Sequence, residues 1–115
     1  MMDAAAHALS DPTRRQILQL VRDDESTVGE IASNFPVTRP AISQHLKVLV
    51  DAQLMAVRPD GNRRYYRARP EGLTDLRAWL DSFWRTSLRN LKVEVERERW
   101  NELKDESQHR GLDDG

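Results

Sequence analysis

The stretch from Thr27 to Val50, TVGEIASNFPVTRPAISQHLKVLV, constrains the fold most, because it predicts two short helices joined by a tight turn. Thr27 and Glu30 have the spacing of a capping box, which starts a helix. Pro36 is expected to end this first helix. Thr38 is a suitable N-cap for the second helix, because its hydroxyl can accept a hydrogen bond from an otherwise unpaired backbone N–H.

The second helix, residues 38–50, has two unlike faces. At about 100° per residue, Ile42, Leu46 and Leu49 fall on one apolar face. The opposite face has short hydrogen-bonding side chains, a cation and almost no acid, and it carries Pro40, Ser43, Gln44 and Lys47. Two helices with this polar outer face are typical of a helix-turn-helix, whose second helix enters the major groove of DNA. The alternative is an ordinary helical hairpin buried in a bundle.

A β-hairpin is predicted after the second helix, over residues 54–68. Strand character is present at 54–58 and, through two tyrosines, more strongly at 63–67. The turn-forming sequence Pro-Asp-Gly-Asn lies between them. Arginines lie on and just after the returning strand, and their alternative role is to protect a sheet edge. Cations near the tip favour a wing that contacts the DNA backbone or minor groove.

The charge distribution supports this interpretation, although the net charge of the chain is only −1. Residues 36–69 contain seven Lys and Arg and two Asp, whereas residues 70–115 contain eight cations and eleven acids. The positive charge is therefore concentrated on the helix-turn-helix and the hairpin, as expected for a protein that presents one face to DNA.

The remaining segments are predicted to be helical. A short alanine-rich helix is expected at 3–9, and a second helix with Asp11 as N-cap and Pro12 as first residue extends to about Arg22. One long helix follows residue 70, and its apolar stripe is too long for so small a domain to cover. We therefore expect a symmetric dimer, the alternative being a helix folded back on its own core. The predicted interface residues are Leu73, Leu76, Leu80, Phe83, Leu88 and Leu91.

The chain resembles the ArsR-type winged helix-turn-helix repressors of bacteria over roughly residues 5–100. The segments that carry the resemblance are ALSDPTRRQIL, VGEIA, SQHLKVL and DAQLMAVRPDGNRRYYRA. The resemblance implies a mainly α-helical fold with a small β-hairpin wing. It also implies a homodimer, formed through the first and last helices, that represses transcription by binding an imperfect palindrome near its own promoter.

The metal sites of this family are not matched. Metal-sensing members have a cysteine pair near the first helix of the helix-turn-helix, but this chain has no cysteine. A second class uses Asp and His on the last helix, which here has Asp75 and Asp81 but no histidine before residue 107. The chain is thus similar to the SdpR-type branch, and we expect no metal and no cofactor.

Roles for individual residues follow from their place on the polar face of the second helix and from the resemblance to the ArsR-type repressors. Gln44 can read an adenine edge and Ser43 can reach a base or a phosphate. Arg39 and Lys47 are expected on phosphates, and Arg39 can also reach a guanine. Arg63 and Arg64 alternate along their strand, so one of them is expected to reach the DNA directly. His45 has two open interpretations, a hydrogen bond within the domain or a phosphate contact. The predicted DNA-binding set is Thr38, Arg39, Pro40, Ser43, Gln44, His45, Lys47, Arg63 and Arg64.

At 115 residues the chain is expected to form one domain, residues 1–106, with a disordered tail at 107–115. Without a signal peptide or an apolar span, the expected location is the cytoplasm.

The alternative function is a winged-helix module that recruits a protein through its last helix. An enzyme is not expected, because no catalytic cluster is present. Trp79, Phe83 and Trp84 can line a site for an unknown small-molecule effector, but aromatic stripes at helical spacing are usually core.

Overall fold

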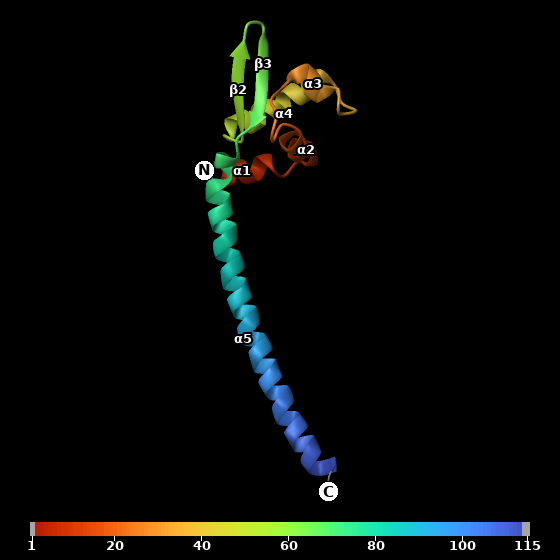
Figure 1. The fold of residues 1–115 in the computed structure, drawn as a ribbon, viewed down its shortest axis with the longest axis vertical. Helices are drawn as coiled ribbons and strands as arrows, with labels where there is room; N and C mark the ends of the chain where they lie inside the picture. The colour runs from red at the N-terminus through yellow and green to blue at the C-terminus, as the bar shows by residue number, and fades with distance from the viewer. Residues whose placement is uncertain (1, 114–115) are drawn as a thin grey trace. The chain divides into compact units, whose positions relative to one another are not determined.

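The structure is a computed structural model that describes the backbone of residues 2–113 and the side chains of residues 2–103. Two short helices come first, α1 (Met2–Ala8) and α2 (Pro12–Leu20). They are followed by β1 (Ser26–Thr27), α3 (Val28–Ala32) and α4 (Arg39–Asp51), and then by β2 (Met55–Asp60) and β3 (Arg63–Ala68). A 3-10 turn, η1 (Pro70–Leu73), leads into α5 (Thr74–Asp113) (Figure 1). The predicted class, mainly α-helical with a hairpin wing, is confirmed.

The chain divides into two compact units, one ending at Ala78 and one beginning at Trp79. The first unit holds the helix-turn-helix and the sheet, and the second consists of α5 beyond its first turn. The helix predicted after residue 70 therefore begins at Thr74. It continues through residue 113, into the segment predicted as a tail, and residues 114 and 115 lie outside the described residues. The single-domain boundary at residue 106 remains a prediction.

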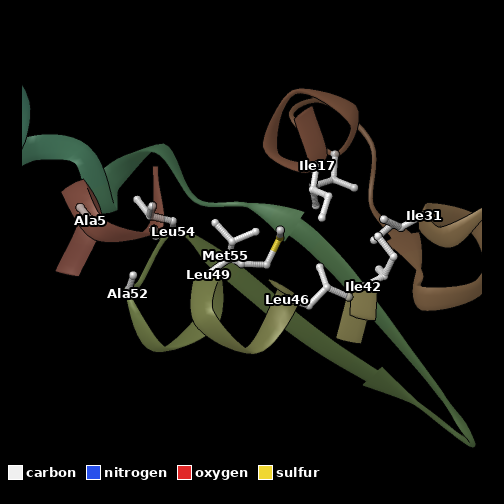
Figure 2. Packing of buried hydrophobic residues seen from close by; sticks show 11 residues of the cluster. Ala5, Ile17, Ile31, Ile42, Leu46, Leu49, Ala52, Leu54 and Met55 are labelled. Carbon is white, nitrogen blue, oxygen red and sulfur yellow. The ribbon is translucent and has the colours of Figure 1, made fainter. Parts of the chain in front are cut away.

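The core of the first unit is made by the apolar face of α4. Ile42, Leu46 and Leu49 are almost fully buried, and Figure 2 shows them in one cluster with residues from α1, α2, α3 and the start of β2. Ile17 and Ile31 lie at the α3 end of this cluster, and Ala5 and Leu54 lie at the α1 end. The predicted apolar face of the second helix is thus the face that packs.

The predicted helix starts are present. The Asp11 carboxylate accepts hydrogen bonds from the amides of Thr13 at 2.8 Å and Arg14 at 3.2 Å. The bond from the Arg14 amide, followed by that from Thr13, holds the pKa of Asp11 below its ordinary value. The Thr27 hydroxyl accepts from the Glu30 amide at 3.2 Å. The Glu30 carboxylate, however, accepts from the Thr27 hydroxyl and so forms a variant of the capping box.

Two details of the helix-turn-helix differ from the prediction. Helix α3 ends at Ala32, before Pro36, because the Ser33 hydroxyl and the side-chain Nδ2 of Asn34 both donate to the Glu30 carbonyl. Such local side-chain bonds compete with continuation of a helix. Phe35 therefore lies in the turn, where it packs against the core.

The sheet has three antiparallel strands in the order β1-β3-β2, one strand more than the hairpin that the sequence predicts. Ser26 and Thr27 pair with Tyr66 and Tyr65 of β3. A two-residue strand has no periodicity of its own, so the segment before Thr27 is predicted as a loop. The extra strand fixes the start of α3 against the wing.

The corner after α4 is tightly packed. Gln53 has a left-handed φ of 63°, and the Arg69 amide donates to the Leu54 carbonyl at 2.7 Å. A Cβ added at Gly72 would lie 2.1 Å from the Gln53 carbonyl oxygen. Only glycine fits at position 72 without movement of the backbone.

Replacing Gly72 with alanine is therefore expected to lower the free energy of unfolding by at least about 2 kcal/mol, measured by urea denaturation. The control is Gly61→Asn at the hairpin tip, where φ is +61° and no atom lies within 4 Å of an added Cβ. Asparagine tolerates the left-handed region, so that variant should stay within about 1 kcal/mol of the wild type. Equal stability of the wild type and Gly72→Ala would contradict the packing of this corner.

Candidate nucleic-acid interface

The start of α4 presents the polar face that the sequence predicts. The Thr38 hydroxyl caps the helix by accepting a hydrogen bond from the Ala41 amide at 3.3 Å. The side chains of one face are all exposed, namely Thr38, Arg39, Pro40, Ser43, Gln44 and Lys47. Because the opposite face is fixed in the core, this exposed face is held rigidly by the rest of the unit.

The wing arginines occupy both faces of β3. The antiparallel register pairs Arg63 with Asp60 and Arg64 with Pro59. Side chains alternate along a strand, so Arg64 shares the face of Tyr66 and Ala68, which pack against the core. Arg63 lies on the other face with Tyr65. The predicted alternation is present, and both guanidinium groups are exposed near the hairpin tip.

A cleft of about 510 Å³ brings the helix-turn-helix and the wing together. Arg39 of α4 and Arg63 and Arg64 of β3 line it, together with Asn62 and the residues from Thr27 to Glu30. A Cβ added at Gly29 would lie 4.0 Å from the Arg39 guanidinium, so this cation lies over the start of α3. Three predicted DNA-binding cations from two distant segments thus share one concave surface.

Charges in and around this cleft are unbalanced. Within the part of the chain that the structure describes, Arg39, Lys47, Arg63 and Arg64 form no ion pair with an acid. Glu30 also lines the cleft, but its carboxylate accepts from the Thr27 hydroxyl at 3.1 Å. The surface therefore has several unneutralised cations and one hydrogen-bonded acid, a balance that suits a polyanionic partner.

Arg58 differs from the other wing cations, because it is neutralised. Its Nε donates to the Glu25 carboxylate at 3.1 Å, its Nη2 makes a second bond to the same group, and its guanidinium lies 4.7 Å from the Tyr65 ring centroid. The Arg58 guanidinium lowers the pKa of Glu25, and the carboxylate raises the pKa of Arg58. Arg58 therefore ties β2 to the segment before β1.

The structure favours the intradomain interpretation of His45. This side chain is half-buried, and its Nδ1 lies 3.4 Å from Nη1 of Arg14. A guanidinium can only donate, so Nδ1 must be the acceptor in this contact. Arg14 also donates to the carbonyl oxygens of Ala8 at 2.7 Å and His7 at 3.2 Å, and thus joins α1, α2 and α4. A phosphate contact by His45 remains a prediction.

The predicted dimer residues are of two kinds. Leu73 lies in η1 and packs against the core of its own unit, and Leu76 is half-buried. Leu80, Phe83, Leu88 and Leu91 are exposed by 44–59%, as are several further apolar side chains of α5. Trp79 and Phe83 stack with ring centroids 5.4 Å apart. The unit from Trp79 onward therefore has a large exposed apolar surface, which is typical of an interaction site.

The described residues contain no group of three or more His, Asp or Glu side chains that could hold a metal ion. None of the described helices is long and apolar enough to cross a membrane.

Sequence reasoning did not find the contributions of Arg14, Glu25 and Asn62. The partners of Arg14 and Glu25 are distant in the chain, 31 residues for Arg14 and His45 and 33 residues for Glu25 and Arg58, and no local pattern marks such pairs. Asn62 lies in the predicted turn, and only the structure shows that it lines the cleft.

Replacing Arg58 with alanine is expected to raise the pKa of Glu25 toward its ordinary value, measured by NMR titration of the side-chain carboxyl carbon. A lowered pKa in the folded state means that the pair stabilises the fold above the unfolded pKa of Glu25, and that this contribution is lost as the pH falls through the folded pKa. The variant should therefore lose less stability on acidification than the wild type. An unchanged Glu25 titration would show that the ion pair does not form in solution.

Comparisons with known proteins agree with this geometry. Residues 11–55 match the family described as bacterial regulatory protein, arsR family. The chain is 50% identical over 86 residues to the HTH-type transcriptional regulator Rv2034 of Mycobacterium tuberculosis, covering 75% of this chain and 80% of the relative. It is 37% identical to the transcriptional repressor SdpR of Bacillus subtilis, covering 71% of this chain and 91% of the relative.

Solved structures give the same result. The homodimeric winged helix-turn-helix DNA-binding domain of Mb0332 from Mycobacterium bovis, a fragment of residues 1–100, superposes with a TM-score of 0.58. It is 30% identical, with 70% of this chain and 75% of that chain covered. The resemblance inferred from the sequence is thereby confirmed, and the chain belongs to the ArsR family of winged helix-turn-helix transcriptional regulators.

Proposed function

We propose that this regulator is a homodimeric repressor that binds a palindromic operator in double-stranded DNA. Helix α4 enters the major groove and the hairpin of β2 and β3 contacts the adjacent backbone or minor groove. The observation that carries the proposal is the cleft in which Arg39, Arg63 and Arg64 gather without acid partners among the described residues. SdpR is named a transcriptional repressor, and this supports repression rather than activation of transcription.

Base recognition is assigned to the exposed middle of α4. A glutamine can donate to and accept from an adenine edge at once, and Gln44 lies on the exposed face one residue after Ser43. The cations contact phosphates, which fix the position of the protein but do not select a sequence. Specificity and affinity are therefore divided between different side chains of one surface.

Dimerisation is assigned to α5, through Leu80, Phe83, Leu88 and Leu91. These side chains are exposed, and burial of apolar surface is the main driving force of most protein association. The homodimeric state of the Mb0332 domain supports this assignment. A dimer presents two copies of α4, which matches the two half-sites of a palindrome.

A DNA-binding regulator of this kind acts in the cytoplasm and needs no cofactor and no metal. No chemical effector is assigned, and zinc or cadmium is not expected to release the DNA.

Replacing Gln44 with alanine should weaken binding to the operator by about 1–3 kcal/mol and relax the preference at one base pair, because a bidentate base contact is lost. Binding to scrambled DNA should not change. Fluorescence anisotropy with the two duplexes measures both quantities. Gln16→Ala, at an exposed position on α2, is the matched control and should behave as the wild type. Equal losses on both duplexes would reject base recognition by Gln44.

Replacing Arg64 with alanine should weaken binding to all sequences and reduce the slope of log K against log salt concentration by about one, because one phosphate contact is lost. The control is Arg89→Ala on α5, outside the cleft, which should leave the slope unchanged. A wild-type slope in the Arg64 variant would show that the wing does not touch phosphate. If both variants, Gln44→Ala and Arg64→Ala, bind DNA as the wild type does, the alternative of a protein-recruiting module through α5 is favoured.

A further inference from the structure

A second cavity, of about 270 Å³, lies in the first unit away from the DNA-binding face. Its lining comes from α2, from the segments around Leu9 and Leu54, and from the end of β3 with η1. Leu9, Leu18, Leu54 and Leu73 supply the apolar surface, and Arg15, Arg22 and Arg69 are the charged residues of the lining. None of the proposed DNA contacts lines this cavity.

The cavity is built from fixed parts. Leu54 is 1% exposed and belongs to the core, and Leu9, Leu18 and Leu73 pack against that core. Arg69 is tied to the corner after α4 twice, through its amide to the Leu54 carbonyl at 2.7 Å and through Nη1 to the Gln53 carbonyl at 3.2 Å. Nη1 of Arg15 donates to the Leu9 carbonyl at 2.7 Å. Both guanidinium groups are therefore oriented without a ligand.

The charge of this cavity is not compensated. Arg22 pairs with Asp23 at 3.1 Å, but Arg15 and Arg69 form no ion pair with an acid within the described residues. Each uses only one Nη in the hydrogen bonds to carbonyl groups, so the other donors of its guanidinium are free for a planar anion. A leucine-lined hollow with two such cations is complementary to a molecule with an apolar body and one carboxylate.

The geometry points to a binding site for a small amphipathic carboxylate, with the apolar body among the four leucines and the carboxylate on Arg15 and Arg69. The volume lies just below the range of about 300–1,000 Å³ for pockets that enclose drug-sized ligands, which favours a medium-chain fatty acid over a long-chain one. Neutral and cationic molecules of the same apolar length are discriminated against, because they leave the two guanidinium groups unpaired.

Titration of the full chain with decanoate, below the concentration at which micelles form, tests this site by NMR of the leucine methyl groups. Saturable shifts confined to Leu9, Leu18, Leu54 and Leu73 are expected, with one decanoate bound per chain. Decanol and decyltrimethylammonium should bind at least about tenfold more weakly, because the charge-assisted hydrogen bonds are absent. This ligand comparison uses only the wild type, so it does not depend on the folding of a variant.

The double variant Arg15→Gln with Arg69→Gln should weaken decanoate binding by about tenfold or more, and the double variant to lysine should restore only part of it, because lysine returns the charge but not the planar set of donors. Arg89→Gln is the matched control and should bind as the wild type, since Arg89 is an exposed arginine of α5 that does not line the cavity. Three results would overturn the proposal. These are equal binding of decanol, shifts that fall on the leucines of α5 instead, and cavity methyl groups that do not respond because a second copy of the chain covers them.

Discussion

Burial of the apolar face of α4 is the interaction on which the rest of the structure depends. Ile42, Leu46 and Leu49 are almost completely removed from solvent, and each such side chain contributes about 1.5–3 kcal/mol relative to an exposed one. They contact a core to which α1, α2, α3 and the start of β2 all contribute (Figure 2). A helix packed on one side by so many elements cannot rotate, so its other face is presented in a single orientation.

Because α4 is held in one orientation, the positions of the charged side chains around the cleft are also fixed. Folding places Arg39, Arg63 and Arg64 around one cleft, and none of them forms an ion pair with an acid among the described residues, although Glu30 also lines the cleft. The stability of the fold does not by itself require arginines without acid partners. On the same hairpin, Arg58 forms an ion pair with Glu25. Arg58, which packs on the wing, is paired, whereas Arg39, Arg63 and Arg64, which line the cleft, are not, and a polyanion that binds in the cleft explains this contrast.

Local features of the fold could be predicted from the sequence, and long-range features could not. The caps at Asp11, Thr27 and Thr38 act over two or three residues, and the two faces of α4 repeat with the helical period, so both are visible in the sequence. The pairing of β1 with Tyr65 and Tyr66, the contact of Arg14 with His45 and the pair of Glu25 with Arg58 join residues more than thirty positions apart. The early end of α3 was also missed, because two polar side chains take the carbonyl of Glu30 where the sequence suggests only a proline stop. For the candidate site, the DNA-binding residues remain predictions from the sequence, and the cleft that brings Arg39, Arg63 and Arg64 together is visible only in the structure.

The central claim is that the exposed face of α4 and the wing together form a sequence-specific DNA-binding surface. Fluorescence anisotropy of the wild type tests it most directly, with a duplex from immediately upstream of its own coding region and a scrambled duplex of the same composition. The salt concentration is varied for both. We predict tight binding to the native duplex, weak binding to the scrambled duplex and a steep salt dependence. Equal and weak binding to both duplexes at all salt concentrations would contradict the claim.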